Sequence, residues 1–358
     1  MIAERPFTHG RIALLNLDAQ IEALEPQVRL GGATVGIRLG LVEMIALRGL
    51  LVGCIADYEK AEEIADQLVH DVPGDATALV ARARTRAAFH RFQDALTDLD
   101  EAERLASNTK TVDSERAAIF QALGRYDEAL YLREEAAQGH PSFENLAALV
   151  GLYAERGEIN AAEKQYQQSL KEYRGVSPLP LALLDFQMGH MWMNEDRPLD
   201  ARISFDSARC LVPAYAQAQG HLAEIDAELG EIESAVATLR LLAAFSDDPD
   251  YAAQLARILG DTGTDGESRY WRQLAAVRYE ELLSIHPEAF ADHAAEFWLA
   301  AGAEPDKALR LAKMNLEVRN TPRARRLLAQ AVAANSSFVS GSGRNGRDFI
   351  STGERKKE

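Results

Sequence analysis

Side chains that could hold a bound partner gather in one short stretch, MGHMWMN, at Met188–Asn194. Thioethers are flexible and polarisable, so a methionine-rich surface can adapt to the side chains of a bound peptide. Methionines at helical spacing also fill ordinary hydrophobic cores. The stretch is therefore either part of a packed core or a peptide-binding patch, and its residue types alone leave both interpretations open.

The rest of the chain shows no motif for catalysis or metal binding. His286 and His293 lie seven residues apart with Glu288 and Asp292 nearby, but the HP pair at His286 ends a helix and interrupts any shared face. The run GGATVG at Gly31–Gly36 lacks the lysine of a phosphate-binding loop and the spacing of a dinucleotide site. A GxSxG nucleophile elbow is also missing. We therefore expect no catalytic residues, no metal ligands and no cofactor, and hence no enzyme.

An internal repeat must position the Met188–Asn194 stretch. Three segments align with one another: DYEKAEEIADQL, RFQDALTDLDEA and RYDEALYLREEA. Their alanines recur at a constant spacing, at Ala61, Ala95 and Ala129. The series of alanines continues at Ala162, Ala201, Ala235 and Ala308. Small residues mark close helix crossings, and large residues such as Trp192 fill the space beside them.

This pattern resembles the tetratricopeptide repeat, a unit of helix, turn and helix. The stretch from about Leu14 to Ala324 is similar to bacterial tetratricopeptide-repeat proteins of undefined biochemical role. The resemblance implies an all-α fold, a right-handed α-α superhelix of about seven to eight helix-turn-helix units. Such solenoids stack their units in one dimension and expose a long concave surface.

The solenoid is expected at residues 1–335, with an N-terminal cap at about 1–41 and a final helix at 323–335. The units between them are placed at about 42–75, 76–109, 110–142, 143–181, 182–215, 216–249, 250–288 and 289–322. Ser, Gly and charged residues then dominate, which predicts a disordered tail at 336–358. The final helix lacks the second helix of its unit, so one of its apolar faces is expected to be incompletely covered, which leaves a homodimer through this helix open.

Departures from the repeat pattern lead to expectations about burial. Arg82 and Arg86 stand where apolar residues are usual, so they must extend to solvent or pair with carboxylates. Cys54 and Cys210 lie in apolar helical stretches, where we expect buried, reduced thiols without a disulfide.

The repeat geometry implies which side chains line the concave groove. On the first helix of the fifth unit, Gly189 and Trp192 should face the packed interior. The opposite arc of that helix carries Phe186, His190, Met193 and Asn194. Arg84 and Gln121 occupy the same arc in earlier units. These six side chains are the predicted partner-binding residues. Only Arg84 approximates the Lys, Asn and Arg set with which some tetratricopeptide proteins clamp the C-terminal carboxylate of chaperones.

The overall charge restricts the partner. The net charge is −16, which disfavours nucleic acid because an acidic protein repels phosphates. The longest apolar stretch is too short and carries Arg48, so no membrane contact is expected. The N-terminus lacks an apolar signal-peptide core, and we expect a cytoplasmic protein. The predicted partner is a protein or peptide, basic or amphipathic.

These observations favour a non-enzymatic scaffold or adaptor that binds a peptide or helix in its concave groove. The alternative is a ligand- or peptide-sensing regulatory protein whose superhelix closes around a small peptide or metabolite. Two further alternatives are an enzyme and a helical-repeat RNA binder. An enzyme is disfavoured because no catalytic motif is present, and an RNA binder because its groove needs basic residues that this chain lacks.

Overall fold

The protein is all-α, as predicted. The structure is a computed structural model that describes residues 7–345, and this range contains eighteen helices and no strand. The first nine helices are α1 (Gly10–Arg29), α2 (Val35–Val52), α3 (Ile55–Asp71), α4 (Ala76–Ala88), α5 (Phe92–Leu105), α6 (Lys110–Leu123), α7 (Tyr126–Gly139), α8 (Phe143–Glu155) and α9 (Ile159–Glu172). The other nine are α10 (Leu179–Asn194), α11 (Pro198–Leu211), α12 (Ala216–Glu228), α13 (Ile232–Phe245), α14 (Pro249–Asp261), α15 (Asp265–Ile285), α16 (Pro287–Leu299), α17 (Pro305–Val318) and α18 (Pro322–Asn345).

Helices α2 to α17 form eight antiparallel pairs, which α1 and α18 flank. Local signals set the helix ends. For example, the Asp75 side chain accepts hydrogen bonds from the first free N–H groups of α4. The turn inside each pair contains one residue with positive φ. In chain order these residues are Gly53, His90, Gly124, Gly157, Asp196, Gly230, Gly263 and Ala303. A left-handed residue ends the first helix and reverses the chain for the second.

The repeat core follows the anchoring alanines. All seven of them, from Ala61 to Ala308, have 0% exposure. Gly189 and Trp192 lie in the interior, as predicted: Trp192 is buried, and a methyl group on Gly189 would come within 2.4 Å of the Phe205 ring. Small residues at these crossings allow the paired helices to approach closely, and large side chains occupy the remaining volume.

Several expectations about boundaries need correction. The limits placed at 41/42 and 181/182 fall inside α2 and α10, because these first helices begin earlier than a regular unit requires. The final helix does not end at residue 335: α18 continues to Asn345, since each added residue costs little once a packed first half has nucleated the helix. The rest of the predicted tail, 346–358, lies outside the described residues. Cys210 is exposed and Cys54 is half-buried, because their positions on the repeat do not point into the core.

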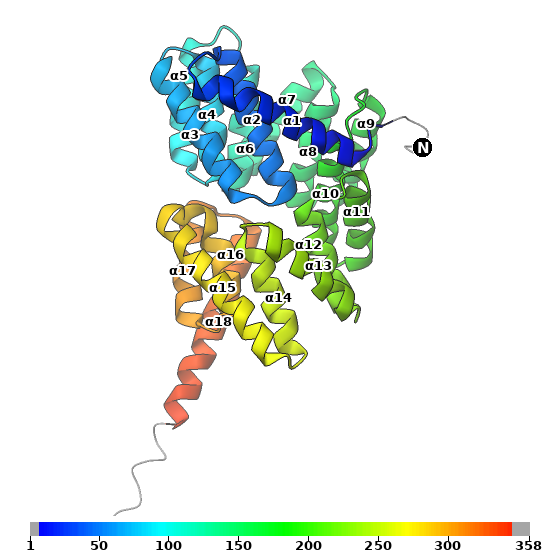
Figure 1. Cartoon of the computed structure of the whole chain (residues 1–358), viewed down its shortest axis with the longest axis vertical. Coiled ribbons are helices and arrows are strands. Elements are labelled where there is room, and N and C mark those ends of the chain that lie inside the picture. Colours follow the sequence, from blue (N-terminus) through cyan, green and yellow to red (C-terminus); the bar gives the residue numbers. More distant parts are fainter. Residues whose placement is uncertain (1–6, 346–358) are drawn as a thin grey trace, which may run out of the picture.

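The late helices of the superhelix pack back against its first helices. In Figure 1, α14–α18 lie as a second layer below the layer that contains α2–α6. One hydrophobic cluster joins α1 and α2 to α10, α11 and α12, and it includes the fully buried Ile21, Leu41 and Ile45 with Tyr215 and Val212. A second contact joins the start of α3 to the segment before α14. There, Asp247 accepts hydrogen bonds from the N–H groups of Ile55 at 2.6 Å and Ala56 at 2.9 Å. The early and late units therefore form one closed body.

Candidate functional site

Four of the six predicted partner-binding residues lie together on α10. Phe186 and His190 are perpendicular neighbours, with ring centroids 4.6 Å apart. His190 also meets His221 of α12 at 4.6 Å and 82°. Phe186 and His190 are half-buried, so their rings both pack against the core and remain partly open to solvent. The inner surface of α10 and α12 thus presents adjacent flat rings, which suit contact with apolar or aromatic groups.

The ring of Phe205 on α11 packs against the rings of Phe186, His190 and His221. It has 0% exposure and stacks on His221 at 4.9 Å, with Phe186 at 5.4 Å. The glycine at position 189 makes this arrangement possible, since the Phe205 ring fills the space where any side chain of residue 189 would lie. The inner rings are therefore held in place by the core between α10, α11 and α12, which spans two repeat units.

Met193 and Asn194 continue this inner surface at the end of α10. Met193 is half-buried in the cluster around Phe205 and Trp192. Asn194 is exposed, and its Oδ1 accepts a hydrogen bond from Nη2 of Arg326 at 3.1 Å. Arg326 belongs to α18, so the last helix reaches α10 from the other side of the closed superhelix. Here the apolar surface borders a polar group with spare hydrogen-bonding capacity.

Arg84 and Gln121 belong to a different group, on α4, α6 and α8. Arg84 donates to Glu115 at 2.8 Å and to Glu43 at 2.5 Å. Gln121 donates to Glu155 at 2.8 Å. The polar atoms of both predicted residues thus already have partners, and these partners lie on helices other than α10.

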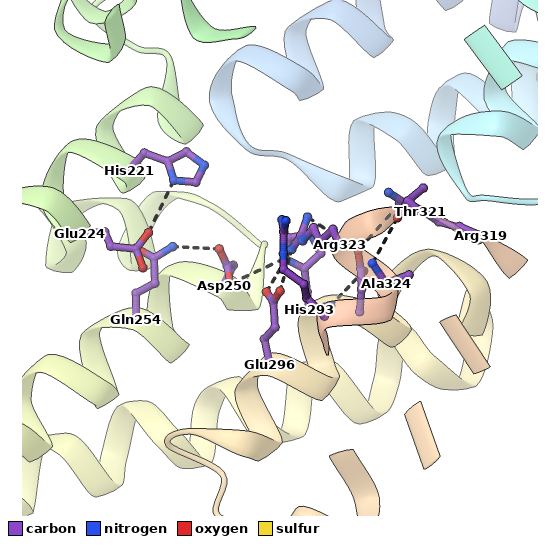
Figure 2. Close-up of polar contacts among 12 residues, drawn as sticks. His221, Glu224, Asp250, Gln254, His293, Glu296, Arg319, Thr321, Arg323 and Ala324 are labelled. Carbon is purple, nitrogen blue, oxygen red and sulfur yellow. Dashed lines mark hydrogen bonds and ion pairs between the residues drawn. The ribbon is translucent and has the colours of Figure 1, made fainter. Parts of the chain in front are cut away.

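Figure 2 shows a polar network that continues the inner surface beyond α10, most of which the sequence did not predict. It starts at His221 and Glu224 of α12, where Nδ1 of the imidazole lies 3.6 Å from Oε2 of the carboxylate. On α14, Gln254 donates to Asp250 at 2.9 Å, and Asp250 is 3.9 Å from His293 of α16. The network ends where Arg323 of α18 donates to Glu296 at 3.0 Å. Carboxylates and hydrogen-bond donors therefore alternate along the inner helices α12, α14, α16 and α18.

Electrostatics divide the histidines of the inner surface into two kinds. Burial, with His221 and Arg323 nearby, lowers the pKa of His190 to about 3. Burial also opposes the charge on His293, but Asp292 and Asp250 outweigh it and raise its pKa to about 10. At neutral pH the surface therefore presents a neutral imidazole at His190 and a protonated one at His293, where Asp250 and Asp292 balance the charge.

His90 is a third histidine whose protonation is set by its neighbours. Its Nδ1 lies 3.0 Å from the carbonyl oxygen of Glu288, to which it donates, and its Nε2 accepts from Arg319 at 3.2 Å. Burial and the Arg319 charge lower its pKa to about 4, against the opposing effect of Asp292. Neutral His90 thus links the α4–α5 turn to α16 and α17.

Acid is expected to weaken this link. A lowered pKa in the folded state means that the stabilising contribution is complete above the ordinary value of 6.5 and is lost as the pH falls toward 4. After allowance for partial solvent screening, we expect a loss on the order of 1 kcal/mol between pH 7 and pH 4.5. Urea unfolding at both pH values measures it. His90→Asn is the control, because Asn tolerates positive φ and does not titrate; an identical pH dependence in this variant would contradict the assignment.

The described part of the chain contains neither a group of metal-ligating side chains nor a helix that could span a membrane. Among the described residues, no three or more His, Cys, Asp or Glu side chains are grouped so that they could hold a metal ion. His286 and His293 point to different partners, Glu59 and Asp250. Within residues 7–345, no helix combines the length and the apolar composition needed to cross a membrane.

Comparisons with known proteins bear on the fold. No protein-family model and no curated protein matches the sequence. The human IFIT1 dimer with m7Gppp-AAAA is 15% identical, with 88% of this chain and 76% of that chain covered and a TM-score of 0.55. The human IFIT1 dimer with PPP-AAAA gives 15% identity, 90% and 77% coverage and a TM-score of 0.54. A tetratricopeptide repeat protein from Parabacteroides merdae gives 17% identity, 72% and 98% coverage and a TM-score of 0.42.

The eight helix pairs follow the repeat period of the sequence and stack into one superhelix. The chain has the tetratricopeptide-repeat fold. At these identities the likeness to solved structures concerns the fold alone, and function must be argued from the site.

The tetratricopeptide period predicts part of this network. Glu224 stands one full repeat period after His190, so it occupies an inner position on the first helix of the next unit. Arg323 and Arg326 had no such signal, because α18 follows the last complete tetratricopeptide unit and its placement depends on how the superhelix closes.

Proposed function

We propose that this tetratricopeptide protein is a non-enzymatic scaffold that binds a segment of another protein on the inner surface of α10 and α12. One observation carries the proposal: Phe186, His190 and Met193 are half-buried, neither sealed in the core nor fully exposed, and they border the Asn194–Arg326 pair. Binding sites for protein segments combine apolar anchors of this kind with a polar rim.

The chemistry of the surface suggests the type of segment. The rings of Phe186, His190 and His221 offer flat apolar contacts, and Met193 adds an adaptable thioether. Glu224, Asp250 and Glu296 lie on the following inner helices; each already has a basic partner in the chain, but the net charge of −16 leaves an excess of carboxylates. An amphipathic segment with apolar residues on one face and basic residues on the other matches both features. Its carboxylate contacts would set orientation and association rate more than affinity.

A second candidate, a regulatory protein that senses a peptide or small ligand, is favoured by the closure of the superhelix. A closed body can bind differently in closed and open states, which is the requirement for a ligand-dependent switch. The hydrophobic cluster that joins α1 and α2 to α10–α12 is the observation behind this candidate. Binding that raises thermal stability and compacts the chain would support it over a static scaffold.

An RNA ligand is not proposed, although the human IFIT1 structures hold m7Gppp-AAAA and PPP-AAAA. Arg84 and Arg323 on the inner surface already pair with carboxylates, and Arg319 lies 3.8 Å from Asp292. Phosphates would have to displace these carboxylates against a net charge of −16. Affinity for a phosphate backbone depends on unpaired Lys and Arg.

The test uses a phage library of random peptides as the probe. Binders selected on the intact chain are then measured by titration on His190→Ala/Met193→Ala, which removes inner contacts and leaves the packing of Phe186 on Phe205 and Tyr215 in place. The matched control is Leu199→Ala/Ile203→Ala, two side chains on α11 with 62% and 69% exposure. We expect at least about a tenfold loss of affinity in the first variant only, as for binding hot spots. Equal affinity in all three proteins would overturn the site.

A further inference from the structure

The two layers of the closed superhelix meet at a row of turns, which we call the seam. In the seam, the turns at Gly53, His90 and Gly124, one from each of the first three units, contact the segments that follow α13, α15 and α17. The Ser246 hydroxyl donates to the Gly53 carbonyl, and His286 stacks on Phe89 with centroids 3.8 Å apart. At the last position, the Asn320 N–H donates to the Leu123 carbonyl at 3.3 Å.

One end of the seam is strongly apolar. There, α1 and α2 share the cluster of Leu41, Ile45 and Tyr215 with α12, and Tyr251 of α14 approaches Gly53. Each of the three cluster side chains is at most 1% exposed. Separating this end would return a large apolar area to water, so it is the part of the seam that resists opening most.

The other end is mainly polar: apart from Val318, which packs against the α4–α6 cluster, it is closed by the segment Arg319–Arg326, which we call the clasp. Across the seam the clasp makes three side-chain or backbone hydrogen bonds. They join Arg319 to His90 at 3.2 Å, Asn320 to Leu123 at 3.3 Å and Arg326 to Asn194 at 3.1 Å. Water can replace each of these bonds when the seam opens, so their net contribution is small compared with the apolar end.

The clasp makes stronger contacts with α16 and α17, which lie on the same side of the seam. Arg323 pairs with Glu296 at 3.0 Å, and Arg319 lies 3.8 Å from the buried Asp292. Ala324, Leu327 and Ala331 of α18 are at most 2% exposed against α16 and α17. The clasp would therefore move together with α16, α17 and α18.

We propose that α16–α18 swing away from α4–α7 about the apolar contact of α2 with α12, and that the clasp keeps them closed over the inner surface. Opening separates Arg326 from Asn194 and widens access to the half-buried Phe186, His190 and Met193. The swing itself is independent of the proposed function, whereas its use for admitting a partner segment rests on that function. The asymmetry of the seam carries the inference: the α2–α12 end buries many more apolar side chains than the clasp end, so the clasp end separates at the lower cost in free energy.

Two glycines provide a matched pair of variants. Gly124 has φ +81°, and a Cβ atom there would lie 2.5 Å from the backbone oxygen of Asn320 in the clasp. Gly157 has φ +75° in the equivalent turn of the next unit, with nothing within 4 Å of its Cβ position. Alanine strains the backbone similarly at both positions, but only Gly124→Ala pushes against the clasp.

Hydrogen–deuterium exchange on the full chain measures the opening. In Gly124→Ala, the amides of the clasp should exchange about tenfold faster than in the unmodified protein, as expected for the loss of a local hydrogen-bonded contact. Gly157→Ala should leave them unchanged. Diethylpyrocarbonate, which modifies accessible neutral imidazoles, should label His190 and His221 faster in Gly124→Ala only, with the exposed His70 and His140 as internal references.

A second variant keeps the test valid if Gly124→Ala fails to fold. Arg326→Gln removes one exposed clasp contact without adding strain, and we expect two- to threefold faster clasp exchange, about what one weak surface contact contributes. Unchanged clasp exchange in both Gly124→Ala and Arg326→Gln, or equal effects of Gly124→Ala and Gly157→Ala, would overturn the clasp. If clasp exchange rises but the selected peptides associate no faster with Gly124→Ala, the clasp stands and its role in admitting the segment is overturned. If no peptide binds any of the proteins, the proposed function fails instead.

Discussion

Asp98→Ala is expected to lower the free energy of unfolding by about 3–5 kcal/mol, the usual result of removing one member of a buried ion cluster. Asp98 is 3% exposed on α5. Its carboxylate accepts from Arg82 at 3.0 and 2.6 Å and from Arg86 at 2.7 Å. Without it, two largely buried guanidinium groups of α4 would lack their principal counter-charge, and the α4–α5 pair would lose its central contact.

Urea unfolding followed by circular dichroism measures this loss. Glu101→Ala is the matched control on the same helix, since it breaks an exposed ion pair with Arg104 that contributes at most about 1 kcal/mol. A triple variant, Arg82→Met, Arg86→Met and Asp98→Leu, replaces the whole cluster with apolar side chains and should recover most of the stability. The buried-charge account would be wrong if Asp98→Ala cost no more than Glu101→Ala, or if the triple variant were less stable than Asp98→Ala.

The sequence predicted that Arg82 and Arg86 either extend to solvent or pair with carboxylates, without indicating which carboxylate. In the structure both pair with Asp98. Several acids follow within a few turns, among them Asp94, Asp98 and Asp100. Choosing among them requires the rotation of α5 relative to α4, which the pattern of small and large residues constrains only loosely.

The fold was more accessible from the sequence than the candidate site. The helix pairs depend on contacts within one repeat unit, so Ala61, Ala95 and Ala129 were enough to predict them. The closure depends on the small rotation between neighbouring units, summed over many of them. The contact between the α6–α7 turn and Asn320 joins segments that lie far apart in the sequence, and it leaves no trace in local periodicity.

The candidate site divides in the same way. Phe186, His190, Met193 and Asn194 share one helix, so helical spacing alone grouped them correctly on α10. Arg84 and Gln121 were grouped with them by position in the repeat, yet the structure shows each engaged by a carboxylate of its own neighbourhood. Arg326, which touches Asn194, lies on α18 and could be found only once the superhelix closed.

Phe205→Ala should cost about 3–5 kcal/mol of unfolding free energy, as expected for the loss of a fully buried aromatic ring. Phe205 has 0% exposure and contacts the rings of Phe186, His190 and His221. The variant should therefore also disorder the inner surface and weaken binding of the selected peptides. Ile203→Ala is the control on the same helix: this side chain is 69% exposed, and its removal should change stability by less than about 0.5 kcal/mol.

Combining Phe205→Ala with Gly189→Ala tests the packing between α10 and α11. In the unmodified protein, Gly189→Ala places a methyl group 2.4 Å from the Phe205 ring and should cost about 1–3 kcal/mol. In the Phe205→Ala background the same methyl group enters the vacated space, and alanine also favours the helix by roughly 1 kcal/mol over glycine. Gly189→Ala should then be neutral or stabilising, giving a coupling of at least about 1 kcal/mol in a double-mutant cycle. Additive effects of the two substitutions would contradict this account. They would mean that the contact between Gly189 and Phe205 does not hold the Phe186, His190 and His221 rings in position.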